Sequence, residues 1–199
     1  MLEGNPGMTE DEARALIFKD RAPKNAVAIL SDTLCDALGK KLAAYSITNF
    51  PANEPGQVEA LEYYCPDCLA SVPGVGWRAY CDNDAVWTAD GAESIVFRIL
   101  DRMARARFDL RAVDPSEQKE TLAFARALSS FRGSRAVSEL GKRSPVLFRT
   151  PNSFDADPEL LNCCGIAVNL RTGEARKAEA WDFFTMTTGC RPVAGPTPI

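Results

Sequence analysis

The sequence predicts an α+β fold that is mainly helical, with two β-hairpins, at about residues 76–88 and 165–178, packed on the helices. Three observations support this class. Apolar residues recur at helical spacing over several long segments. Two shorter segments instead alternate apolar and polar residues around turn-forming residues. Hydrophobic residues make up 46% of the 199 residues, so the chain has enough apolar surface to bury a core.

The first 51 residues predict an N-terminal helical segment, whose role the sequence does not indicate. Thr9–Lys19 and Asn25–Tyr45 have helical patterns, and Arg21–Lys24, which contains a proline, separates them. The stretch Ser46–Gly56 contains two prolines and two asparagines, which is typical of a linker. We therefore place a domain boundary between residues 51 and 52.

The first hairpin follows a predicted helix over Gln57–Leu69. Its first strand alternates apolar and polar residues from Trp77 to Cys81, and Asp82–Asp84 supplies turn residues before the return strand. We expect Trp77 and Trp87 to pack near each other as core anchors. The alternative is that these two rings stack on nucleic-acid bases.

The middle of the chain predicts three helices. Ser94–Phe108 has the clearest amphipathic pattern, with an apolar stripe on one side and arginines on the other. Asp114 followed by Pro115 is typical of a helix start, and we expect this helix to run to about Phe131 and to end at Gly133. A short helix over Ser134–Gly141 follows.

The second hairpin lies near the C-terminus. Asp157 and Pro158 favour a short capped helical turn, and Ile166–Leu170 has the composition of a strand. Arg171–Gly173 provides the hairpin loop, with glycine where a positive φ is needed. The Pro- and Gly-containing residues 193–199 are predicted to form a tail, which leaves 52–192 as the main domain.

Positive charge is concentrated in the middle of the chain. Residues 97–150 hold twelve Lys and Arg against six Asp and Glu, a net charge of +6, although the whole chain carries −4. A basic region in an acidic chain indicates a surface for an anion such as nucleic acid. The alternative is a solvated helix face with ion pairs such as Asp101–Arg105. The candidate nucleic-acid-binding residues are Arg98, Arg102, Arg105, Arg132, Arg135, Lys142 and Arg143.

The chain has no histidine, which excludes a Ser-His-Asp triad and any zinc site that contains histidine. The Cys65-Pro-Asp-Cys68 spacing supplies only two of the four ligands of a structural zinc site, so we read these cysteines as thiols. Asp155 and Asp157 could form a paired-carboxylate metal site, but turn and capping roles explain both. We expect no catalytic residue, no metal and no cofactor.

The run from Phe154 to Glu174 resembles the Asp-Ala-Asp-Pro, Leu-Leu-Asn and Leu-Arg-Thr-Gly-Glu stretch of phage and plasmid primase-helicases. In those proteins it lies in the accessory domain before the helicase motor, the region named after the poxvirus primase-helicase N-terminal domain. The resemblance covers about residues 57–192. It includes Tyr63-Tyr64, the Val72–Trp77 strand and Phe183–Thr185.

The resemblance implies a non-catalytic accessory domain that guides single-stranded DNA or helps to assemble the helicase ring. No Gly-x-x-x-x-Gly-Lys-Ser/Thr motif occurs, so the chain lacks the ATPase motor and is expected to be either a fragment or a naturally short phage or mobile-element protein. The implied partners are primase and helicase domains or another replication protein, and oligomer formation is left open.

The alternative function is a stand-alone protein-binding module, for example an inhibitor of a host protein. No stretch of about 18 apolar residues occurs, and the N-terminus has no signal-peptide pattern. We therefore expect a cytoplasmic protein without a membrane segment.

Overall fold

The computed structural model describes residues 26–109, 113–190 and 192, and it confirms the α+β class. The predicted helix Thr9–Lys19 lies outside these residues. Within them, the helices are α2 (Ala26–Ala44), α3 (Glu54–Tyr64), α4 (Ala92–Ala106), α5 (Gln118–Leu128) and α6 (Phe131–Gly141). The strands are β1 (Leu69–Val72), β2 (Gly76–Cys81), β3 (Val86–Thr88), β4 (Leu160–Cys163), β5 (Ile166–Asn169) and β6 (Ala175–Lys177).

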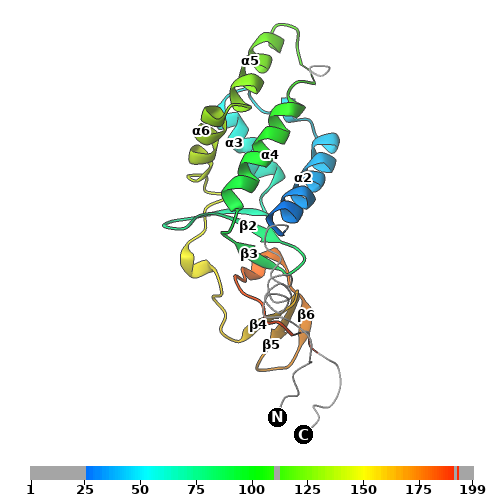
Figure 1. The fold of residues 1–199 in the computed structure, drawn as a ribbon, viewed down its shortest axis with the longest axis vertical. Coiled ribbons are helices and arrows are strands. Elements are labelled where there is room, and N and C mark those ends of the chain that lie inside the picture. The colour runs from blue at the N-terminus through cyan, green and yellow to red at the C-terminus, as the bar shows by residue number, and fades with distance from the viewer. Residues whose placement is uncertain (1–25, 110–112, 191, 193–199) are drawn as a thin grey trace, which may run out of the picture.

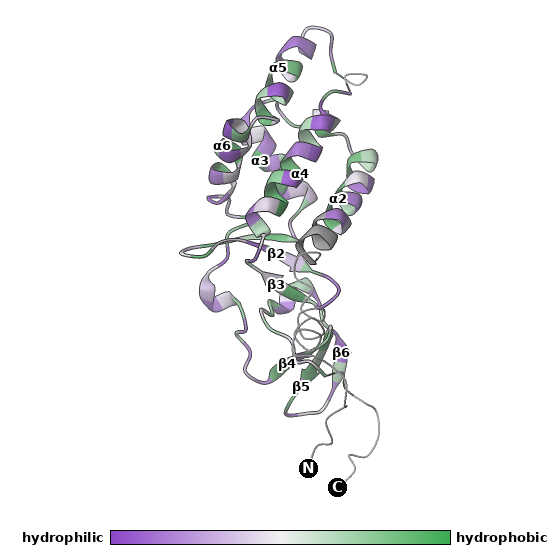
Figure 2. Ribbon diagram, viewed as in Figure 1, coloured by the Kyte–Doolittle hydropathy of each residue, from purple (hydrophilic) through white to green (hydrophobic). Residues whose placement is uncertain are grey.

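The helices occupy one end of the molecule, the sheet β4-β5-β6 the other, and the sheet β1-β2-β3 lies between them (Figure 1). Helix α4 runs through the helical end and packs against α2, α5 and α6. Hydrophilic and hydrophobic residues alternate along α4 and α5, as expected for helices that bury one side (Figure 2). No helix in the described residues is long and apolar enough to span a bilayer.

The first predicted hairpin is confirmed as β2 and β3, and it gains a third strand. Leu69 pairs with Ala79, so β1 runs antiparallel to β2. The sequence predicts Leu69 at the end of a helix, but α3 already ends at Tyr64, and the amide of its capping residue Cys65 donates to the carbonyl of Leu61. Strand pairing decides the conformation of this short segment because four residues carry little local signal.

The expectation that the two hairpin tryptophans pack near each other is wrong. Trp77 belongs to the helical core, and its indole N–H donates to Ser138 at 2.9 Å. Trp87 lies opposite Tyr80 and belongs to the second cluster, between the two sheets. Successive residues of a strand point to opposite faces, so the pairing that aligns Trp87 with Tyr80 places it away from Trp77.

The second predicted hairpin is confirmed as β5 and β6, again with an added strand, β4. The predicted capped turn at Asp157 is present, but as a single turn rather than a helix. The carboxylate of Asp157 accepts the amide of Glu159 at 2.9 Å, its carbonyl accepts the amide of Leu160 at 3.2 Å, and strand β4 begins at Leu160. Ala167 and Ala178 pack with Trp87 in the second cluster, so this sheet meets the helices by way of the first sheet.

Two helix boundaries in the basic middle of the chain were wrong. Asp114 accepts the amide of Ser116 at 2.8 Å, but the residues after it form a turn and α5 begins only at Gln118. Gly133 does not end a helix; it lies in the first turn of α6, where Ser130 accepts its amide at 3.1 Å. A Cβ on Gly133 would lie 2.1 Å from the carbonyl oxygen of Ala127, so glycine here permits close approach of α5 and α6.

The predicted linker Ser46–Gly56 is largely structured. Ser46 caps a 3-10 helix, η1 (Ile47–Asn49), and Asn53 caps α3 by accepting the amide of Gly56 at 2.8 Å. Ile47 is buried in the same cluster as residues of α3 and α4. The domain boundary between residues 51 and 52 stays a prediction.

Candidate nucleic-acid interface

The arginine face of α4 is turned toward α2. The guanidinium of Arg98 lies 2.5 Å from the carboxylate of Asp32, and Arg105 lies 2.8 Å from Asp101 on its own helix. Arg102 lies beside Gly39 of α2, where a Cβ would be 3.0 Å from its Nη2 atom. Ion pairing, which the sequence left as the alternative, therefore holds for two of these three residues.

A groove of about 430 Å³ separates the two helices. Its walls carry as many carboxylates as guanidinium groups, because α2 contributes acidic residues opposite the arginines of α4. The groove is therefore close to neutral, and an incoming phosphate would compete with carboxylates already in place. The lining residues are Asp32, Cys35, Asp36, Arg98, Asp101, Arg102 and Arg105.

The cations of α6 have a different setting. Arg132 and Arg135 lie on its exposed side and Arg143 lies in the turn that follows its end, and none of the three pairs with a carboxylate among the described residues. Lys142 already forms an ion pair, because its ammonium lies 2.8 Å from the carboxylate of Glu139. The hydrogen bond from Lys142 lowers the pKa of Glu139, and the charges of Arg135 and Arg143 lower it further.

Packing explains why α6 presents these arginines to solvent. Ser134, Val137, Ser138 and Gly141 form the buried side of the helix, which packs on α3 and α4. Arg132 and Arg135 occupy exposed positions on the remaining side of the helix, and Arg143 is exposed in the turn after it. We define the exposed arginines of α6, Arg132 and Arg135, together with Arg143 of the turn that follows it, as the α6 cationic stripe.

An exposed aromatic residue begins the same helix, and no pattern in the sequence indicates its exposure. Phe131 is 70% exposed, and its ring centroid lies 5.8 Å from that of Phe97 on α4. The sequence placed Phe131 at the end of the preceding helix. A helix boundary at the capping residue Ser130 would have marked it as the first residue of α6.

The tryptophans of the first sheet are core residues. Trp77 is 3% exposed and Trp87 is 2% exposed, and the indole N–H of Trp87 donates to the carbonyl of Ala180 at 2.8 Å. Neither ring presents a face to solvent, so base stacking, the alternative weighed from the sequence, is excluded for this pair.

Arg107 follows the α4 arginines in the sequence but lies inside the protein. It donates to Gln57 at 2.9 Å and to the carbonyls of Phe50 and Pro51 at 3.1 Å each, and it lies over the ring of Phe124. Burial lowers the pKa of Arg107 to about 10. This arginine therefore ties α4 to the segment before α3 and contributes no surface charge.

Neither Cys65 and Cys68 nor Asp155 and Asp157 belong to a group of metal ligands in the described part of the chain. No three His, Cys, Asp or Glu side chains lie close enough there to hold a metal ion. A hydrogen bond between the two thiols raises the pKa of Cys65 and lowers that of Cys68. Asp155 accepts the amide of Thr185 at 2.9 Å. Asp157 makes the turn before β4.

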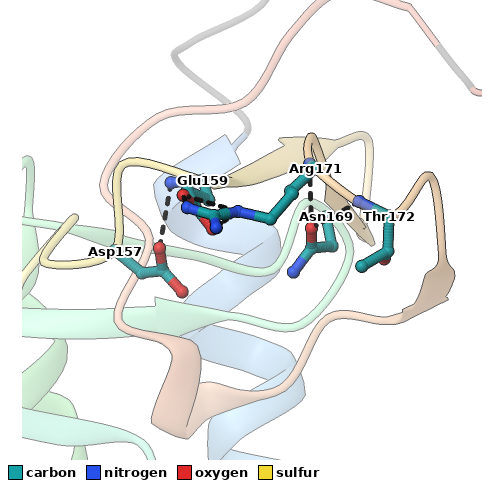
Figure 3. A network of polar contacts seen from close by, with 5 residues as sticks. All are labelled: Asp157, Glu159, Asn169, Arg171 and Thr172. Atoms are coloured by element: carbon teal, nitrogen blue, oxygen red, sulfur yellow. Dashed lines mark hydrogen bonds and ion pairs between the residues drawn. The ribbon is translucent and has the colours of Figure 1, made fainter.

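The run Phe154–Glu174 builds the hairpin of the second sheet (Figure 3). Arg171 in the loop after β5 forms a two-pronged ion pair with Glu159, which precedes β4. Asn169 accepts the amides of Arg171 and Thr172 at 2.9 and 3.0 Å. The most specific motif of the sequence is thus explained by hairpin geometry.

A family model described as D5 N terminal like matches residues 58–198, which is more than half of the chain. No curated protein and no solved structure matches.

Proposed function

Because the chain belongs to the D5 N-terminal-like family, the N-terminal region of phage, plasmid and poxvirus primase-helicases, we propose that it is a non-catalytic accessory domain that guides single-stranded DNA. The observation that carries this proposal is the α6 cationic stripe, whose three guanidinium groups face solvent without carboxylate partners in the described residues. Guanidinium groups bind phosphate oxygens through paired hydrogen bonds.

The two sets of cations differ in what they can offer to DNA. Each phosphate contact of the α6 stripe requires no existing ion pair to break, whereas Arg98 and Arg105 must first leave Asp32 and Asp101. We therefore assign the main phosphate contacts to α6. Arg102, which has no carboxylate within ion-pair distance among the described residues, is assigned a secondary contact from α4.

Such contacts neutralise phosphates without reading bases, so binding is independent of sequence and decreases with salt. The role is proposed as non-catalytic because the sequence has neither a Walker A motif nor a histidine. Its partners are proposed to be primase and helicase domains or another replication protein, in the cytoplasm where phage and plasmid DNA is replicated.

The test is binding of a fluorescent oligothymidylate, measured by anisotropy between 50 and 200 mM salt. Arg132→Gln with Arg135→Gln is expected to weaken binding and to reduce the slope of log K against log salt by about 1.4, since each contact with single-stranded DNA contributes about 0.7. The matched pair Arg102→Ala with Arg105→Ala is expected to have a smaller effect, because Arg105 already pairs with Asp101.

Two outcomes contradict the proposal. If the wild-type chain does not bind the oligonucleotide even at 50 mM salt, the protein-binding alternative is favoured. If the chain binds but the α6 double variant keeps the wild-type affinity and salt slope, the contact surface lies elsewhere.

A further inference from the structure

Phe131 is exposed in a way that the core does not explain. It begins α6, is 70% exposed, and belongs to neither hydrophobic cluster. Among the residues that the structure describes, its aromatic neighbour is the partly exposed Phe97 of α4, whose ring plane is inclined by 46° to its own. Burial of a phenylalanine ring normally contributes about 1.5–3 kcal/mol, so the fold gives up most of that contribution here.

The charges next to this ring indicate what would cover it. Arg132 follows Phe131 directly, and Arg135 lies one turn further along the helix, about 6 Å away along the axis at 1.5 Å per residue. Both side chains are exposed, and neither pairs with a carboxylate among residues that the structure describes. An apolar ring beside unpaired guanidinium groups matches a base attached to its phosphate.

We propose that Phe131 is a base-stacking residue, which packs its ring on one base of a single strand whose phosphates contact Arg132 and Arg135. The inference rests on the proposed function, because it names how the same surface binds the bases of single-stranded DNA. Phe97 packs beside the Phe131 ring from the α4 side, with ring centroids 5.8 Å apart. Stacking on a π-face is independent of base identity, so sequence preference stays weak.

The experiment compares an oligothymidylate with an abasic deoxyribose-phosphate oligomer of the same length, which has the same charge but no bases. The wild-type chain is expected to prefer the oligothymidylate by roughly 5- to 150-fold, the range that corresponds to one stacked base. Phe131→Leu, which keeps an apolar side chain without a π-face, is expected to reduce this preference to less than about twofold. Its affinity for the abasic oligomer should not change.

Two further variants control for folding and for position. Phe131→Trp is expected to keep the preference, which shows that a ring is required at this position. Trp181→Ala removes a ring of nearly equal exposure, 69%, in the sheet-bearing end of the molecule and is expected to have no effect. Thermal unfolding followed by circular dichroism verifies that each variant is folded.

The outcomes separate the inference from the proposed function. If Phe131→Leu still prefers the oligothymidylate, or if Trp181→Ala is the variant that loses the preference, the stacking role is wrong while phosphate binding stands. If the wild-type chain binds neither oligomer, both are wrong, and an exposed ring flanked by arginines is then better read as a protein-binding anchor.

Discussion

Replacing Arg107 by methionine should destabilise the protein strongly, although no contact with DNA is proposed for this residue. Arg107 is 1% exposed and donates three hydrogen bonds, to Gln57 at 2.9 Å and to the carbonyls of Phe50 and Pro51 at 3.1 Å each. Methionine fills a similar volume but donates nothing, so it leaves three acceptors without their donor.

The size of the loss in unfolding free energy depends on whether each of the three acceptor oxygens can bind water instead. Gln57 is fully buried, so its oxygen has no access to water, and loss of a bond from a charged donor costs about 1.5–3 kcal/mol. The carbonyls of Phe50 and Pro51 belong to partly or fully exposed residues and can bind water, so each should cost less, about 0.5 kcal/mol. The expected loss is about 3 kcal/mol.

Urea unfolding of Arg107→Met beside the wild-type chain measures this loss as a shift in midpoint at constant slope. The matched control is Arg105→Met, which removes an exposed guanidinium that pairs with Asp101 and should cost about 0.5 kcal/mol or less. If both variants unfold at the same urea concentration as the wild-type chain, the buried hydrogen bonds of Arg107 do not contribute as reasoned here.

Two further predictions concern helix packing and alkaline pH. Gly133→Ala should lower stability by about 1–3 kcal/mol, because its Cβ would lie 2.1 Å from the carbonyl oxygen of Ala127; an unchanged melting temperature would contradict this close approach. Burial raises the pKa of Tyr64 to about 12, above the value of about 10 in an unfolded chain, so its contribution to stability is present below pH 10 and is lost as pH rises to 12. The free energy of unfolding measured from pH 10 to 12 should fall less steeply in Tyr64→Phe than in the wild-type chain. Some decline remains in the variant because the pKa of Tyr80 is also raised to about 12. An equally steep fall in both proteins would contradict the role of Tyr64.

Long amphipathic patterns predicted their elements well. The stripe in Ser94–Phe108 predicted α4 to within two residues at each end, because the apolar residues of one side of the helix must face one core. The same pattern predicted the outward side of the arginines. It did not predict the ion pair of Arg98 with Asp32, since residues 66 positions apart meet only through the packing of α2 on α4.

Short elements and glycine were the sources of error. Strands β1 and β4 have four residues each, and pairing with a neighbouring strand decides their conformation. Gly133 was read as a helix end because glycine lowers helix propensity, but close contact between α5 and α6 overrides that local cost of about 1 kcal/mol. Predicting the exposure of Phe131 requires the correct start of α6, so the error at Gly133 also hid this exposed ring.

The middle sheet has a consequence for how the chain tolerates insertions and deletions. Trp77 and Ala79 of β2 enter the helical cluster, while Tyr80 enters the cluster between the sheets. Inserting or removing a single residue in this strand would exchange the two sets of side chains and misplace both cores at once. Length changes should therefore be harmful within Gly76–Cys81 and far better accepted at the exposed turn of residues 82–84.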